Sequence, residues 1–125
     1  MAAVVLNITT ADVTASSFVT AYPASSARPD SSVLNPVAGQ TSANAVLVRV
    51  GEGGDISLYN NAGALDLIAD VTGYWAAGSD FTSLTPSRIL DTRSGLGALT
   101  AKLGTTRTLD VTIAGRGGVN VLALA

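Results

Sequence analysis

The segment at residues 86–97, PSRILDTRSGLG, comes closest in residue types and spacing to an active site. It places one carboxylate, that of Asp91, between the guanidinium groups of Arg88 and Arg93. Such a set could position a general acid, bind a ligand, or hold a turn through charged hydrogen bonds.

The spacing of these charges favours the turn. Residues two apart in a strand share a face, so we expect Asp91 and Arg93 to lie together and Arg88 to lie on the opposite face. An aspartate just before a Thr-Arg-Ser-Gly loop can accept backbone N–H groups and an arginine fork. A general acid needs a second carboxylate nearby and a raised pKa, and the segment supplies no such carboxylate. We therefore predict that Arg88, Asp91 and Arg93 form a structural turn lock.

The residue types that are missing narrow the chemistry further. The chain of 125 residues has no histidine and no cysteine, which removes Ser-His-Asp catalysis, thiol nucleophiles, disulfides and most zinc sites. Asp55, Asp66 and Asp70 are not arranged in a calcium-loop motif. We predict that the chain is not an enzyme and uses no metal or cofactor.

Composition also limits the partners. The net charge is −2, with one lysine and six scattered arginines, so we predict no nucleic-acid binding. No apolar run approaches the length of a membrane span, and the first residues lack the pattern of a signal peptide. With 47% hydrophobic and 13% charged residues, residues 1–125 are predicted to fold as one domain.

Alternation with a period of two dominates the pattern, and helical periodicity is nearly absent. Three sets of apolar residues alternate most clearly: Val4, Leu6 and Ile8; Val46, Val48 and Val50; Leu65, Leu67, Ala69 and Val71. Glycine- and asparagine-rich segments at residues 51–54 and 60–63 predict hairpin loops. Roughly eight short strands of this kind predict an antiparallel β-sandwich, immunoglobulin-like or jelly-roll-like. A β-barrel or a propeller-like unit is the alternative.

A possible binding surface comes from aromatic residues at strand ends. Trp75 and Tyr59, with the loop residues Asn60 and Asn61, could stack on a sugar ring and hydrogen-bond to its hydroxyl groups. Tyr74, in contrast, is expected to pack into the core, with its hydroxyl bound to the backbone.

Several phrases occur together in order: AVVLNITT, GDISLYNNAGALDLIADVTGYW and FTSLTPSRILDTRSGLGA. The combination of LDTR with ADVTGY resembles a β-rich tandem repeat, about as long as this chain, of secreted and cell-wall-associated actinobacterial proteins. The resemblance implies an accessory module outside the cytoplasm, and it assigns no catalytic residue to this chain. In that family LDTR commonly opens a repeat, whereas here it lies in the second half, so the chain resembles a circularly shifted repeat.

The shift would leave apolar strands at both ends, at residues 2–10 and 119–125. We expect them either to pair with each other or to dock into a neighbouring copy, because apolar terminal strands need partners. The sequence thus favours a non-catalytic extracellular or cell-wall-associated structural module that forms a homo-oligomer or contacts a neighbouring repeat. The alternative is a carbohydrate-binding, lectin-like module that binds cell-wall polysaccharide.

Overall fold

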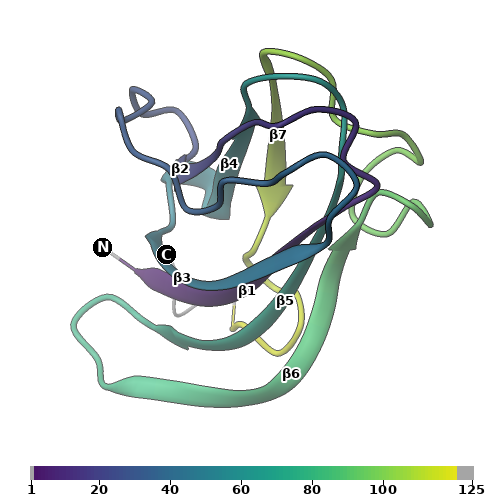
Figure 1. The fold of residues 1–125 in the computed structure, drawn as a ribbon. Coiled ribbons are helices and arrows are strands. Elements are labelled where there is room, and N and C mark those ends of the chain that lie inside the picture. The colour runs from purple at the N-terminus through teal and green to yellow at the C-terminus, as the bar shows by residue number, and fades with distance from the viewer. Residues whose placement is uncertain (1, 121–125) are drawn as a thin grey trace.

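The chain folds into β-strands arranged in two layers (Figure 1). A computed structural model describes residues 2–120. Its strands are β1 (Ala3–Ala11), β2 (Val19–Pro23), β3 (Ser42–Arg49), β4 (Asp55–Asn60), β5 (Asp66–Trp75), β6 (Phe81–Asp91) and β7 (Arg107–Thr112). A single 3-10 turn, η1 (Glu52–Gly54), precedes β4. Over the described range, no helix has the length and apolar character needed to cross a membrane.

The strands form two antiparallel sheets. One sheet has four strands in the order β3-β1-β5-β6, and the other has three in the order β2-β4-β7. The four-stranded sheet lies below the three-stranded sheet in Figure 1, and the two pack face to face. The predicted antiparallel β-sandwich is therefore confirmed, and the two sheets do not close into a barrel.

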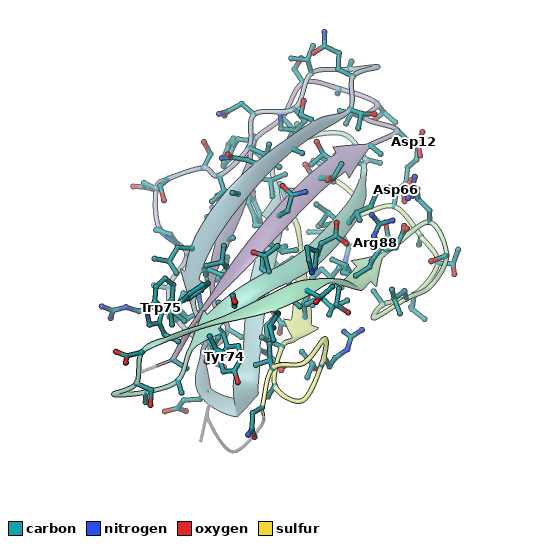
Figure 2. All side chains as sticks on the ribbon, turned by 90° about the horizontal axis from the view of Figure 1, so that it is seen from below. Asp12, Asp66, Tyr74, Trp75 and Arg88 are labelled. Carbon is teal, nitrogen blue, oxygen red and sulfur yellow. The ribbon has the colours of Figure 1, made fainter. Side chains whose placement is uncertain are left out.

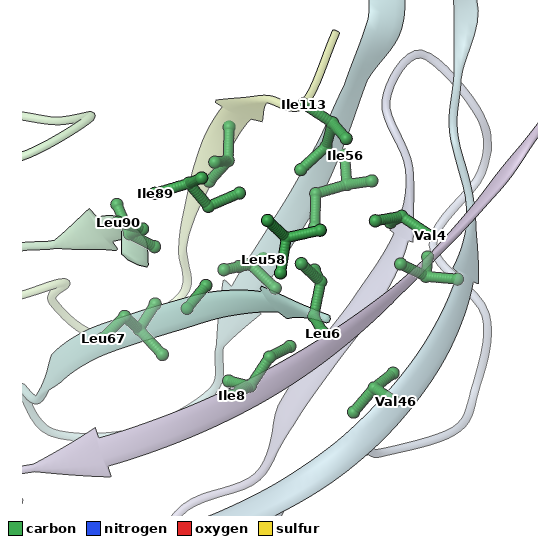
Figure 3. Packing of buried hydrophobic residues seen from close by; sticks show 14 of the residues in the cluster. Val4, Leu6, Ile8, Val46, Ile56, Leu58, Leu67, Ile89, Leu90 and Ile113 are labelled. Atoms are coloured by element: carbon green, nitrogen blue, oxygen red, sulfur yellow. The ribbon is translucent and has the colours of Figure 1, made fainter. Parts of the chain in front are cut away.

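The core lies between the two sheets and follows the predicted alternation. In β1, Val4, Leu6 and Ile8 are fully buried, whereas the residues between them are only half-buried on the outer face. Figure 3 shows these side chains pointing toward Ile56 and Leu58 of the opposite sheet. Burial of apolar surface on this scale is the main force that holds the sheets together.

The predicted hairpin loops at residues 51–54 and 60–63 are wrong in one respect. The strands that they join, β3 to β4 and β4 to β5, belong to different sheets, so both segments cross the sandwich. Gly53 and Gly54 do adopt the positive φ angles that turn glycines supply, 81° and 82°. Turn chemistry therefore predicted where the chain bends, but not which sheet it enters next.

The N-terminal strand does not depend on the C-terminal segment for its partners. β1 lies inside its sheet, with β3 paired along one edge and β5 along the other. Of the predicted strand at residues 119–125, Val119 is buried and Asn120 is exposed, and neither belongs to a described strand. Because both edges of β1 are occupied, the expected pairing of the two terminal strands with each other is wrong. Residues 121–125 lie outside the described residues, so the docking of that segment into a neighbouring copy stays a prediction.

One inward-facing residue of β1 gives a stability prediction. Thr10 is fully buried, and no group in residues 2–120 hydrogen-bonds its Oγ1 atom. Replacing the hydroxyl by a methyl group removes an unsatisfied polar atom, so Thr10→Val should raise the free energy of unfolding by about 1 kcal/mol. Urea denaturation measures this change, with Thr9→Val on the outer face of the same strand as the control. A Thr10→Val protein no more stable than the wild type would show that the hydroxyl has a partner.

Candidate functional site

Asp91 is the centre of a closed turn at the end of β6. Its carboxylate accepts the backbone N–H of Arg93 at 3.0 Å, together with Nε and Nη2 of the same arginine at 3.0 and 2.9 Å. Its backbone N–H donates to the carbonyl of Leu96 at 2.9 Å, and its carbonyl accepts N–H groups from Ser94, Gly95 and Leu96. The side chain and the backbone of one residue thus close the loop from both ends.

Arg88 does not lie on the face that alternation predicts. Its Nη1 atom is 3.7 Å from Asp91 Oδ2, and its Nε donates to Asp70 Oδ1 at 2.8 Å. The register explains the contact: Ala69 pairs with Leu90 and Asp70 pairs with Arg88, so Ile89 is an extra residue in β6. This bulge turns the strand by one position and brings Arg88 to the side of Asp91. The expected opposite placement of Arg88 and Asp91 is wrong for that reason.

The electrostatics at Asp91 favour its ionised form. The hydrogen bonds from the Arg93 side chain lower the pKa of the Asp91 carboxyl, with smaller contributions from the Arg93 backbone N–H and the positive charge of Arg88. The same contact raises the pKa of Arg93. A general acid needs a raised carboxyl pKa, so this arrangement supports a fixed ion pair and does not support proton donation from Asp91.

The aspartates considered for calcium do not converge. Asp55 belongs to the three-stranded sheet, whereas Asp66 and Asp70 belong to β5 of the other sheet. Asp66 accepts a hydrogen bond from Thr92 Oγ1 at 2.7 Å, and Asp70 is bound to Arg88. No group of three potential metal ligands forms anywhere in residues 2–120.

Asn60, predicted as a ligand-binding residue, is fully buried. Its Nδ2 atom donates to three carbonyl oxygens, those of Gly63, Leu103 and Gly104, at 3.0–3.2 Å. Its Oδ1 atom accepts the hydroxyl of Ser17 at 2.7 Å. All of these partners belong to this chain, and they join three loops at one end of the sandwich.

Tyr59 and Trp75 do not form a common platform. They lie on β4 and β5, which belong to different sheets, and each has its own aromatic neighbour. Tyr59 is buried: its ring packs against Phe18 and is covered by the Arg28 guanidinium, and its hydroxyl donates to Asn61 Oδ1 at 3.2 Å. The structure therefore brings Tyr59 and Asn61 together, but Trp75 is elsewhere. Tyr74, next to Trp75, is in the core as expected, but its hydroxyl makes no hydrogen bond to the backbone of residues 2–120.

Trp75 forms part of an apolar area on the outer face of the four-stranded sheet. Its ring lies 4.5 Å from that of Phe81, which also covers Gly73. Figure 2 looks onto this sheet and shows Trp75 near one end, with Arg88 and Asp66 toward the other. The cross-strand register adds further outward-facing residues to the area. We call the set the outer apolar patch: Ala3, Val5, Ala45, Leu47, Trp75 and Phe81.

Two of the most exposed members of this patch, Leu47 and Phe81, were not among the predicted binding residues. Leu47 is 62% exposed and Phe81 is 45% exposed, although both are large apolar residues. A signal for Leu47 was present: the run Val46-Leu47-Val48 places an apolar residue on both faces of a strand, only one of which can face the core. Arg28, which covers Tyr59, lies in a polar loop and carries no such signal.

The fold and these contacts define an all-β sandwich domain with an arginine-paired turn and an apolar outer face. No family model, curated protein or solved structure that was searched matches the chain.

Proposed function

We propose that this domain is a non-catalytic structural module that associates with copies of itself through the outer apolar patch. The observation that carries the proposal is the exposure of Leu47 and Phe81 on either side of Val5 and Trp75. Contiguous apolar surface of this kind costs free energy in water and marks interaction sites. A patch that meets its own copy across a two-fold axis is self-complementary, so one surface suffices for a dimer.

The position of β1 favours this face over exchange of the N-terminal strand. Both edges of β1 are already hydrogen-bonded within the chain. Its exchange between copies would require the four-stranded sheet to open, whereas the patch is available without any change in the fold. The patch also ends at charged groups, with Arg49 beside Ala3 at one side and the Asp70–Arg88 ion pair at the other. Charged residues at the margin limit the contact to the apolar area.

A cross-linking experiment tests the surface directly. The chain has no cysteine, so the thiol introduced by Ala45→Cys is unique. We expect a bismaleimide reagent to join two copies of Ala45→Cys at micromolar concentration. Ala101→Cys, which is exposed on a loop away from the patch, is the matched control and should remain mostly monomeric. Equal cross-linking of the two variants would mean that random collisions, and not the patch, bring the copies together.

The location of the module is a second part of the proposal. One lysine, no cysteine and many Thr, Ser and Asn residues support a place outside the cytoplasm, in the medium or on the cell wall. Resemblance to the actinobacterial repeat supports the same location. Fractionation of the source cells tests it, and recovery in the cytoplasmic fraction alone would contradict it.

A second candidate function, polysaccharide binding, is favoured by the Trp75–Phe81 ring pair. Exposed aromatic rings can stack on the C–H faces of sugars as well as on another copy of the domain. Pull-down with cell-wall polysaccharide separates the two functions. Binding that is lost in Trp75→Ala would favour the lectin-like function, whereas retention no greater than that of an unrelated protein would dismiss it.

A further inference from the structure

We propose that a cleft beside the three-stranded sheet binds an acidic sugar, with the sugar carboxylate held by Arg28. The cleft has a volume of about 290 Å³, and its walls come from the segment before β2 and from the loop between β2 and β3. It is lined by Phe18, Arg28, Pro29, Asp30, Ser31, Ser32 and Asn35. The volume is close to the lower limit of small-molecule sites, roughly 300 Å³. None of these residues belongs to the outer apolar patch, so the inference does not depend on self-association.

The Arg28 guanidinium is held in place by an aromatic ring, and its N–H groups are left to bind a ligand. Its central carbon lies 3.7 Å from the centre of the Tyr59 ring, so the flat face of the group stacks on the ring. Within residues 2–120 no ion pair or hydrogen bond engages its N–H groups. A stacked guanidinium keeps these donors in its own plane, where they can meet the two oxygens of one carboxylate.

The surface beneath Arg28 is fixed before any ligand arrives. Tyr59 is buried in the middle strand of its sheet, and its ring is braced by Phe18 at a centroid distance of 6.1 Å. The loop that carries Arg28 is anchored by the hydroxyl of Thr20, which donates to the carbonyl of Ser31 at 2.7 Å. Little conformational freedom of the loop and its side chains is therefore lost on binding, which favours a higher affinity.

The other groups of the cleft match a hydroxylated ring. Ser32 donates to Asn35 Oδ1 at 3.2 Å, which leaves the Asn35 amide N–H groups directed away from that contact. Phe18 and Pro29 provide apolar surface for the C–H face of a sugar ring. Serine, asparagine and aspartate side chains can bind its hydroxyl groups.

Asp30 favours a ligand that carries only one negative charge. Its carboxylate lines the same cleft and can accept hydrogen bonds from ligand hydroxyls. Its negative charge opposes any anionic ligand, and it opposes a phosphate ester, with close to two charges, more strongly than a carboxylate with one. A neutral sugar would leave the guanidinium without its strongest partner. Arg28 and Asp30 together therefore favour a sugar with one carboxylate, such as a hexuronate.

An NMR titration of the isotope-labelled chain with D-glucuronate tests the site. We expect shifts of the backbone amide signals of Phe18 and residues 30–35, with an affinity in the millimolar range. D-glucose has the ring without the carboxylate, and acetate has the carboxylate without the ring, so each should bind about tenfold more weakly or worse. Absence of shifts with glucuronate overturns the site, equal binding of glucose overturns the role of Arg28, and equal binding of acetate overturns the recognition of a sugar.

Variants of Arg28 give the second measurement. Arg28→Gln and Arg28→Lys should each weaken glucuronate binding at least about tenfold, because glutamine lacks the charge and lysine lacks the planar fork. Arg107→Gln removes an exposed arginine outside the cleft and should bind like the wild type. Amide spectra that otherwise match the wild type show that each variant is folded. An Arg28→Gln protein that binds glucuronate as tightly as the wild type would contradict the proposal.

Discussion

Asn60→Asp should destabilise the domain by about 4 kcal/mol at neutral pH, although the two side chains have nearly the same shape. The amide of Asn60 is fully buried and donates to three carbonyl oxygens of two different loops. A carboxylate in its place has no hydrogen to donate, so a negative charge would face three acceptors. Urea denaturation gives the free energy of unfolding directly.

The neighbouring residue supplies a matched control for this substitution. Asn61 uses only its Oδ1 atom in the described contact, as the acceptor of the Tyr59 hydroxyl. Asn61→Asp retains an acceptor at that place and should cost less than about 1 kcal/mol. The loss of unfolding free energy in Asn60→Asp should become smaller in acid, because the introduced carboxyl can donate a hydrogen bond once it is protonated. A small and pH-independent effect at Asn60 would contradict its role as a link between loops.

Asp91→Asn should lower the free energy of unfolding by about 2 kcal/mol at pH 7. The substitution keeps the size of the side chain but removes the negative charge that pairs with Arg88 and Arg93. It also disrupts the two hydrogen bonds from the Arg93 guanidinium. Asp80→Asn, at an exposed position with no ion pair in residues 2–120, should leave stability nearly unchanged. If Asp91→Asn were as stable as the wild type, the predicted turn lock would be wrong.

Acid should reduce the difference between Asp91→Asn and the wild type. Arg93 lowers the pKa of Asp91 in the folded state, so the folded protein holds this carboxylate ionised more strongly than the unfolded chain does. The resulting stabilisation is present above the unfolded pKa of an aspartate, about 3.9, and is lost as pH falls through the lower folded value. The denaturation midpoints of the two proteins should therefore converge as the pH falls below the unfolded pKa and through the lower folded value. A constant difference across this range would assign the effect to packing instead of charge.

The alternation of apolar residues predicted the inward faces of the sheets but not how the strands connect. Val4, Leu6 and Ile8 are buried as expected, because the period of a strand depends only on local backbone geometry. The segments at residues 51–54 and 60–63 contain good turn residues, yet both cross between sheets. The same bend serves a hairpin and a crossing, and the choice depends on pairing with strands that are distant in sequence.

In the candidate site, too, local spacing predicted some contacts, whereas others depend on parts of the chain that are distant in sequence. The contact between Asp91 and Arg93 follows from their spacing, but the position of Arg88 depends on the extra residue Ile89 in β6. A bulge is set by the pairing of two strands, and its only trace in the sequence is the buried pair Ile89-Leu90. Asn60 was expected in a loop, where its side chain could bind a sugar hydroxyl. Its burial depends on the carbonyl groups of Leu103 and Gly104, in a loop more than forty positions away, which no local pattern reveals.

The mass of the protein in solution shows whether copies associate through the outer apolar patch. Light scattering coupled to size-exclusion chromatography should give a mass above the 12.5 kDa of one chain at micromolar concentration. Leu47→Glu should restore the mass of a single chain, because it places a charge inside the contact. Leu99→Glu, at a loop position that is 86% exposed, should leave the association unchanged. A wild-type protein that remains strictly monomeric at this concentration would rule out association through this patch.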